Sequence, residues 1–345
     1  AWASSAKSSG TARLRVVPCE GHSTPVHSPS ARAMMLPPVS IITINYNEVE
    51  TTARCLDSLR TLTYPHVQRI VVDNGSEAGQ AERLQERFPD VKVIANPTND
   101  GFAGGNNVGL DHAHGEYILL LNNDAHVTPG LLEPLVEAME ARPSVGIVSP
   151  KIVFAGTEDA AGNAQIQYAG SYPMNPYTGR CHTVGYRERD DGRFDTAGPT
   201  HLAHGAAMMI RRDVFDTIGP MEESYFLYYE EHDFTAHAKR AGFEVYYEAR
   251  ATVHHEASVS VGKDSPLKAY YMTRNRLIYL HRNVRGVAWL TSVLVYWLLA
   301  LPKALLTHAW NGDRDLLEAT WQGACWHLCN PMPKPTPVPA SPAPA

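Results

Sequence analysis

The feature that most constrains the fold is an alternation of short apolar runs and amphipathic segments between residues 39 and 148. Strand-like runs occur at 39–44, 70–72, 91–94, 117–121 and 145–148, separated by segments with helical spacing at 49–62, 81–88, 105–113 and 130–142. After an irregular stretch at 155–200, the same alternation returns with a predicted helix at 230–241 and a predicted strand at 244–247. This pattern predicts an α/β fold, with a mainly parallel sheet flanked by helices on both faces.

Composition divides the 345-residue chain into four parts. Residues 1–36 are rich in Ser, Ala, Pro and His and lack the apolar run of a signal peptide, and residues 331–345 are rich in proline. Both are predicted to be disordered. Between them we expect an α/β domain at 37–265, with halves at 37–150 and 151–265, and a helical C-terminal region at 266–330.

Charge, cysteines and missing motifs exclude several classes of protein. The net charge of −6 argues against a general nucleic-acid binder. The five cysteines form no CxxC pair, which favours a reducing compartment. The first strand is not followed by G-x-G-x-x-G, and the chain has no G-x-x-x-x-G-K-[ST], so a dinucleotide-binding Rossmann unit and a P-loop nucleotidase are both disfavoured.

Polar residues follow four successive predicted strands, at 45–47 (NYN), 73–76 (DNGS), 96–107 (NPTNDGFAGGNN) and 122–124 (NND). Any one of these clusters is explained by turn formation. Four at one sheet edge predict a polar cleft, because ligands of such sheets bind beyond the carboxyl ends of the strands. Asp73 and Asn74 suit hydrogen bonding to a base or ribose. Asp124 suits a hard divalent cation that would neutralise a diphosphate leaving group.

In this order and spacing the motifs resemble glycosyltransferase family 2, whose members are inverting enzymes of GT-A fold that use nucleotide-diphosphate sugars. The likeness is greatest to bacterial rhamnosyltransferase-like members and spans roughly residues 38–285. It rests on 44–47 (INYN), 71–76 (VVDNGS), 99–107 (NDGFAGGNN) and 120–124 (LLNND), and continues through 205–212 (GAAMMIRR), 228–233 (YYEEHD), 253–255 (VHH) and 270–275 (YYMTRN).

The resemblance implies a role for each strand-end residue. A divalent metal, Mg²⁺ or Mn²⁺, would be bound by Asp124, which stands in the place of the family's D-x-D motif, and by His255. His254 would point to the other face of a regular strand. The nucleotide-sugar donor would be held by Tyr46, Asn47, Asp73, Asn74, Asn99, Gly101, Gly104, Gly105, Asn106 and Asn122.

The resemblance also implies a general base. Residues 230–233 match the family's E-D-x-D, in which the second acid usually removes the acceptor's proton, so the base here is Glu231. Glu stands where Asp is usual, and Glu230 and Asp233 remain alternatives. An acidic helix N-terminus favoured by the helix dipole is the structural explanation of the same cluster.

A basic, acid-free stretch predicts contact with a membrane. Residues 266–312 contain no Asp or Glu, and residues 286–302 contain no charge at all. The apolar run is at the short end of the roughly 17–25 residues that span a bilayer. Its cationic flanks and tryptophans favour a helix lying in the membrane interface over a full span or a buried core helix.

Together these observations predict an inverting glycosyltransferase that moves a sugar, with rhamnose from dTDP-rhamnose favoured, to a lipid-linked or growing cell-surface polysaccharide. It would work at the cytoplasmic face of the plasma membrane, without nucleic acid. One alternative is a sugar-phosphate nucleotidyltransferase, which would carry a Gly-rich basic loop where 45–48 (NYNE) stands. Another is a non-catalytic carbohydrate- or nucleotide-binding module, against which Asp124 and Glu231 argue.

Overall fold

The computed structural model describes residues 36–160, 162–256 and 265–334. The described residues from 37 onward belong to one compact unit. The predicted disorder at 1–35 and 335–345 lies outside the described residues. The predicted boundary between 265 and 266 falls just before a helix, α7 (Pro266–Asn283), and stays a prediction.

The described part of the chain is built on a ten-stranded mixed sheet, in which eight strands follow the order β3-β2-β1-β4-β9-β6-β10-β5, while β7 pairs with β6 and β8 with β10. The strands are β1 (Val39–Asn45), β2 (Val67–Asn74), β3 (Lys92–Asn96), β4 (Tyr117–Leu121), β5 (Ala125–Val127), β6 (Val145–Phe154), β7 (Gln165–Tyr168), β8 (Gly198–Pro199), β9 (Ala207–Arg211) and β10 (Glu244–His255). The first four run parallel, as predicted, whereas β9 is antiparallel to both of its neighbours.

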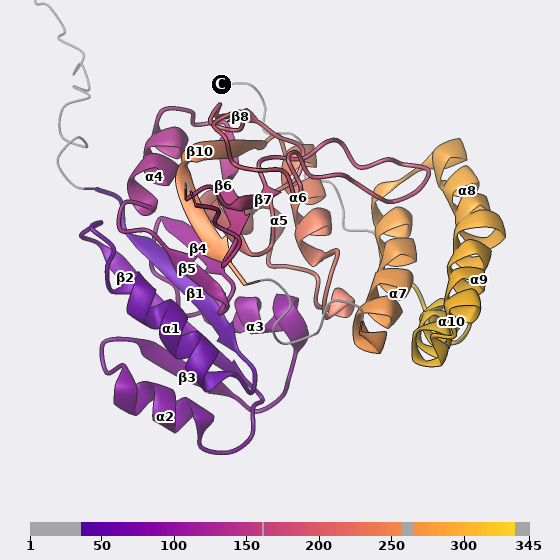
Figure 1. The fold of residues 1–345 in the computed structure, drawn as a ribbon, viewed down its shortest axis with the longest axis horizontal. Helices are drawn as coiled ribbons and strands as arrows, with labels where there is room; N and C mark the ends of the chain where they lie inside the picture. Colours follow the sequence, from indigo (N-terminus) through magenta and orange to yellow (C-terminus); the bar gives the residue numbers. More distant parts are fainter. Residues whose placement is uncertain (1–35, 161, 257–264, 335–345) are drawn as a thin grey trace, which may run out of the picture. The chain divides into compact units, whose positions relative to one another are not determined.

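Helices cover both faces of this sheet, as the sequence predicts (Figure 1). One layer contains α1 (Val49–Leu59), α2 (Gln80–Arg87) and α4 (Leu132–Glu140). The opposite layer contains α3 (Gly101–Leu110), α5 (Arg212–Ile218) and α6 (Glu230–Arg240), and a short 3₁₀ turn, η2 (Glu223–Tyr225), precedes α6. Strand residues alternate between the two cores: Val71 packs with the first layer, Ile70 and Val72 with the second.

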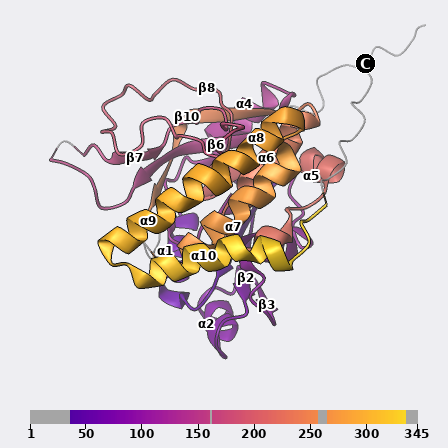
Figure 2. The same ribbon diagram turned by 90° about the vertical axis from the view of Figure 1, so that its right-hand side faces the viewer.

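Helical segments follow the sheet along the chain. After α7 come α8 (Gly286–Val295), a π-helical turn η3 (Tyr296–Ala300), α9 (Leu301–Asn311) and α10 (Arg314–Cys329). Figure 2 shows α8 and α9 continuing one another across α7 and α10. Residues Gly286–Asn311 are long and apolar enough to cross a membrane, and only 17% of their most apolar window is buried. The run predicted at 286–302 is therefore not a buried core helix.

Parallel register brings the polar strand ends level with one another. Asn45 at the end of β1 lies opposite Asp73 of β2, and Asn74 lies opposite Asn96 of β3. On the far side of the sheet, β10 runs on to His255, which pairs with Ala125 of β5. The four clusters that follow β1 to β4 thus share one edge of the sheet, as expected for parallel strands.

Candidate active site

A buried amide, Asn45, lies at the centre of the polar edge. Its Nδ2 donates to Asp73 Oδ1 over 2.7 Å, and its Oδ1 accepts from Thr52 Oγ1 over 2.7 Å. Thr52 Oγ1 in turn accepts from Asn123 Nδ2 over 3.0 Å. This chain of hydrogen bonds joins the ends of β2, β1 and β4 to α1. Because every link is buried or half-buried, the chain fixes the relative positions of the strand ends.

A second amide, Asn74, organises the loop that precedes α3. Its Nδ2 donates to Asn99 Oδ1 and to the carbonyl of Gly101, and its Oδ1 accepts from Asn96 Nδ2 and from the backbone N–H of Asp100. These contacts use the hydrogen-bonding capacity of Asn74 inside the protein. Its side chain therefore positions a loop, whereas the sequence predicts contact with a base or ribose.

Three groups at this edge remain directed to solvent or only partly bonded. The ring of Tyr46 is 43% exposed. Asn47, with φ of +57°, accepts from the N–H of Glu77 and from Gln80 through its Oδ1, which links the first two strand ends. Oδ1 of Asp73 accepts hydrogen bonds from Asn45 and Ser76. Its Oδ2 has no hydrogen-bond donor in the described part of the chain. A base or ribose can use the Tyr46 ring and this oxygen.

The glycines of α3 make room for protein atoms. A side chain at Gly101, where φ is +70°, would clash with the carbonyl of Phe226. A Cβ at Gly105 would lie 2.9 Å from Ile44 Cδ1, and one at Gly104 would meet the Asp100 side chain. These glycines therefore let α3 pack close to the strand ends and the loop before α6. The amide of Asn106 donates to the Phe102 carbonyl in the same helix, over 2.9 Å.

The two predicted metal ligands meet although they are far apart in the sequence. His255 Nε2 lies 2.9 Å from Asp124 Oδ1, and both side chains are more than 90% buried. The other ring nitrogen, Nδ1, lies 2.8 Å from Gln167 Oε1 on β7. Asn122 Nδ2 lies 3.2 Å from Nε2. His254 points elsewhere, toward Glu158.

The chemistry of this donor set fits a divalent cation. An amide oxygen only accepts, so the contact with Gln167 puts a proton on His255 Nδ1. In the neutral ring, Nε2 then presents a lone pair to a carboxylate oxygen, and a cation between the two satisfies both. Orientation of a ligating histidine through its second nitrogen is common at metal sites. Among the described residues no group of three His, Cys, Asp or Glu forms a complete site, so a cation here needs oxygens from a bound molecule.

The acidic cluster at the start of α6 lies beside this pair, across the loop at 204–205. A Cβ on Gly205 would be 3.7 Å from the Glu231 carboxyl carbon, and the His204 ring lies 6.4 Å from the His255 ring. Glu231 Oε1 forms an ion pair with His232 Nδ1 over 3.1 Å, whereas Oε2 is buried without a partner in the described residues. His232 Nε2 lies 3.3 Å from Cys181 Sγ.

Neighbouring charges give Glu230 and Glu231 opposite pKa shifts. Burial, reinforced by the charge of Glu231, raises the pKa of Glu230 to about 8. Burial also acts to raise the pKa of Glu231, but the charge of His232 outweighs it and holds this pKa below its ordinary value. At neutral pH Glu231 is therefore the ionised member of the pair, and a carboxylate able to accept a proton.

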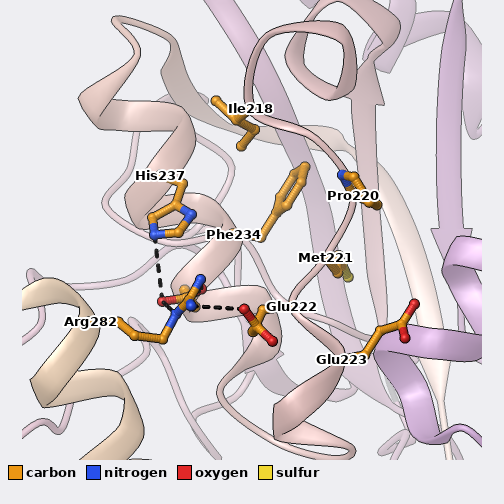
Figure 3. Close-up of a pocket in the computed structure, with 9 residues that line it drawn as sticks. Ile218, Pro220, Met221, Glu222, Glu223, Phe234, His237 and Arg282 are labelled. Carbon is orange, nitrogen blue, oxygen red and sulfur yellow. Dashed lines mark hydrogen bonds and ion pairs between the residues drawn. The ribbon is translucent and has the colours of Figure 1, made fainter. Parts of the chain in front are cut away.

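Asp233, in contrast, is part of a structural ion pair. Arg282 of α7 donates to both of its oxygens over 3.1–3.2 Å, and Asn283 also donates to it. Arg282 pairs in addition with Glu222 over 2.8 Å. Figure 3 shows Arg282, Glu222 and His237 around a cavity of about 350 Å³ between η2, α6 and α7. Both charges of the Asp233–Arg282 pair are nearly inaccessible, so Asp233 ties α6 to α7.

Several residues of the site carry no signal in the sequence. Gln167 lies on β7 within the irregular stretch at 155–200, called the insertion below, and Cys181 belongs to the same stretch. Thr52 lies on α1, seven residues after Asn45, where it reads as an ordinary helix residue. Only His232 lies within a recognised motif, at the variable position of E-D-x-D.

Comparison with known proteins identifies the family of this arrangement. Residues 40–219, more than half of the chain, match the sequence profile described as "Glycosyl transferase family 2". An N-acetylglucosaminyl-diphospho-decaprenol L-rhamnosyltransferase of Mycobacterium tuberculosis is 24% identical over 78% of this chain and 91% of its own. A hexosyltransferase of low-salt glycan biosynthesis from Haloferax volcanii is 26% identical over 71% of this chain and 76% of its own.

Solved structures support the same fold at lower identity. A mannosyltransferase from Pyrobaculum calidifontis, in complex with GDP-Man and Mn²⁺, aligns with a TM-score of 0.52 at 17% identity, over 85% of this chain and 88% of its own. GalNAc-T7 with UDP, GalNAc and Mn²⁺ aligns with a TM-score of 0.53 at 17% identity, over 69% of this chain and 47% of its own. These similarities confirm the predicted GT-A-like fold.

Glu230→Gln is expected to stabilise the fold at alkaline pH. The pKa of Glu230 rises from 4.5 to about 8 on folding, so the stability that its neutral form contributes is present below about pH 4.5 and is lost as the pH rises through about 8. The Tm of the wild type, measured by scanning fluorimetry, should fall more between about pH 6 and pH 9 than that of the variant. The exposed Glu82→Gln is the control. Equal losses in wild type and Glu230→Gln would show that Glu230 is ionised in the folded state.

Proposed function

The chain belongs to glycosyl transferase family 2, and we propose that it is an inverting enzyme that moves a sugar from a nucleotide-diphosphate donor to a lipid-linked or growing polysaccharide of the cell surface. That it is a glycosyltransferase follows from the family and from its relatives. Rhamnose, from dTDP-rhamnose, is the donor sugar that we favour, because one relative is a rhamnosyltransferase. The observation that carries the mechanism is the placement of Asp124, His255 and Glu231 around one loop.

The donor would lie along the carboxyl edge of β1, β2 and β4. The exposed Tyr46 ring is suited to stack on the base, and Asp73 Oδ2 to accept a ribose hydroxyl. Asn45 and Asn74 hold the two strand ends in place. We assign Asn99 and Asn122 to the sugar side, since both follow strands of the carboxyl edge and contact other residues of that edge, Asn74 and His255.

Asp124 and His255 would bind Mg²⁺ or Mn²⁺ together with the diphosphate oxygens of the donor. A cation there supplies positive charge to the departing nucleoside diphosphate. Gln167 holds the His255 ring with Nε2 toward Asp124, where the cation would bind. The mannosyltransferase and GalNAc-T7 structures hold Mn²⁺, which supports a divalent metal as the cofactor of this fold.

Glu231 would remove the proton of the acceptor hydroxyl. It is ionised, one of its oxygens is unpartnered among the described residues, and it lies across the 204–205 loop from the metal ligands. Glu230 is protonated at pH 7 because of its raised pKa. The carboxylate of Asp233 is held in an ion pair with Arg282. The acceptor hydroxyl, activated by Glu231, would attack C1 of the sugar from the side opposite the diphosphate. The nucleoside diphosphate would leave in the same step, which inverts the anomeric centre.

The acceptor would reach the enzyme from a membrane surface. On α8, η3 and α9 a stripe of apolar side chains is exposed at helical spacing, formed by Val287, Leu290, Leu294, Leu298, Leu306 and Trp310. An exposed apolar stripe of this extent marks a protein or membrane contact. We assign it to the headgroup region of the cytoplasmic face of the plasma membrane, where a lipid-linked acceptor is anchored.

Asp124→Ala should abolish transfer and remove the metal dependence of nucleoside-diphosphate binding, because it removes the anionic ligand. Calorimetric titration of UDP and dTDP, each with and without Mn²⁺, checks this. Glu256→Gln is the matched control, since Glu256 follows His255 but pairs with His126 and Arg54. Full activity of Asp124→Ala, or of the wild type in EDTA, contradicts the metal site.

Glu231→Gln should lower the rate of transfer by about 10²–10⁴-fold, because Gln keeps the shape of the side chain but accepts no proton. The affinity for the donor should stay unchanged, since the donor lies at the strand ends. Glu230→Gln and Asp233→Asn are the comparisons, with kcat and donor affinity measured separately. A larger loss of kcat in either of them, at unchanged donor affinity, would assign the base to that residue.

The triple variant Leu298→Gln, Leu306→Gln and Trp310→Gln should leave the membrane fraction without losing stability. These side chains are 67%, 70% and 92% exposed, so their replacement removes little packing. Co-sedimentation with phosphatidylglycerol vesicles and a Tm measurement check both parts. Tyr186→Gln, which changes an exposed aromatic residue of the insertion, should sediment as the wild type does. Unchanged sedimentation of the triple variant would refute the membrane assignment.

A further inference from the structure

A small cavity of about 100 Å³ lies next to the acidic cluster, between the insertion and the C-terminal helices. Its polar wall is formed by Arg180 of the insertion, Arg276 of α7 and Tyr229, which directly precedes α6. Its apolar wall includes Met272, Tyr296 and Leu301. It is separate from the cavity beside Asp233 and from the strand ends that hold the predicted donor residues.

Two guanidinium groups share this cavity without a carboxylate. Arg276 is only 7% exposed, donates through Nε to the carbonyl of Thr178, and lies over the Tyr296 ring at 5.6 Å. Arg180, the second arginine of the lining, is exposed. Within residues 36–160, 162–256 and 265–334, neither arginine forms an ion pair. Burial lowers the pKa of Arg276, and the neighbouring charge of Arg180 lowers it further.

This arrangement favours an anion. A buried cation without a counter-ion is unfavourable, and two cations side by side repel each other. An anion between them removes both penalties and receives charge-assisted hydrogen bonds from two planar groups whose geometry matches phosphate. The volume is well below the ~300–1,000 Å³ of typical small-molecule pockets. The cavity therefore suits a phosphate or diphosphate headgroup, with the remainder of the ligand outside.

The surroundings indicate what that remainder is. On one side, Arg180 is followed by Cys181, whose contact with His232 leads to Glu231. Tyr229 closes the same side, with its hydroxyl donating to the carbonyl of Gly179 over 2.9 Å. On the other side, η3 and α9 carry apolar side chains from the cavity wall to the exposed stripe on α8, η3 and α9. The cavity thus lies between the residues that contact the proposed base through Cys181 and His232 and an exposed apolar surface.

We propose that the Arg180–Arg276 cavity binds the diphosphate group of a lipid-linked acceptor, with its apolar chain leaving along η3 and α9 and its sugar directed toward Glu231. The inference deepens the proposed function and rests on it. It assigns a binding role to α7 and to the part of the insertion around Arg180, whereas Gln167 of the same insertion orients His255.

Binding of farnesyl diphosphate to the full chain, measured by calorimetry, tests the site. Arg180→Gln and Arg276→Gln should each weaken binding at least about tenfold, because each removes one charge-assisted contact. Arg187→Gln is the control, as Arg187 is an exposed arginine of the same insertion with its guanidinium over the Tyr186 ring. Inorganic diphosphate should bind more weakly than farnesyl diphosphate, and farnesol should not bind. Equal affinity of wild type and Arg180→Gln would overturn the proposal.

Competition experiments distinguish this cavity from the donor cleft and from a phospholipid site. Asp124→Ala should still bind farnesyl diphosphate, and UDP with Mn²⁺ should not displace it. Displacement by UDP would place the ligand in the donor cleft and overturn the proposal. Displacement by glycerophosphoglycerol, the water-soluble headgroup of phosphatidylglycerol, would make the site one for phospholipid headgroups and would overturn it too.

The stability of the variants and the rate of transfer complete the test. Arg276→Gln loses a contact with the insertion, so its Tm is measured alongside, and the exposed Arg180→Gln decides the matter if Arg276→Gln unfolds. If the wild type binds farnesyl diphosphate but transfers no sugar to a lipid-linked acceptor, the result counts against the proposed function alone.

Discussion

The buried amide of Asn45 is the interaction on which the rest of the site depends. It lies at the end of β1, fully enclosed, and it joins Asp73 of β2 to Thr52 of α1 and, through Thr52, to Asn123 after β4. An unsatisfied buried amide would cost about 1–3 kcal/mol, so these partners are held together. These hydrogen bonds therefore fix the strand ends at which we propose that the donor binds, and they also position the loop that carries Asp124.

The parallel half of the sheet could be predicted because its signals are local. Runs such as Tyr117–Leu121 are short, wholly apolar and separated by amphipathic helices, so strand and helix follow from periodicity alone. The other half could not. β6 continues through Pro150, and β10 changes register between Glu248 and Thr252, so both strands extend well beyond the predicted runs. β9 pairs antiparallel within the sheet, and that pairing depends on distant partners which no local pattern encodes.

The site divides in the same way. Motif spacing was sufficient to predict that Asp124 and His255 belong to one site, and the fold brings them to 2.9 Å. It could not predict Gln167, because the residue that orients a ring is chosen by tertiary packing. The resemblance likewise implies that Gly101 contacts the donor, whereas in the structure its close neighbour is the Phe226 carbonyl. Local sequence thus identifies groups suited to chemistry better than groups that position them.

Three acids within four residues of α6 have different electrostatic environments because three different neighbours contact them. Burial beside Glu231 keeps Glu230 neutral, His232 keeps Glu231 ionised, and Arg282 of α7 forms an ion pair with Asp233. Cys181 of the insertion, which directly follows Arg180, contacts Nε2 of His232, the ring nitrogen that does not pair with Glu231. The insertion and α7 therefore both set the charge of the acidic cluster and form the walls of the Arg180–Arg276 cavity. In the proposed mechanism, proton transfer and acceptor binding share these two elements, whereas the donor and the metal are bound at the strand ends, with Gln167 of the insertion orienting His255.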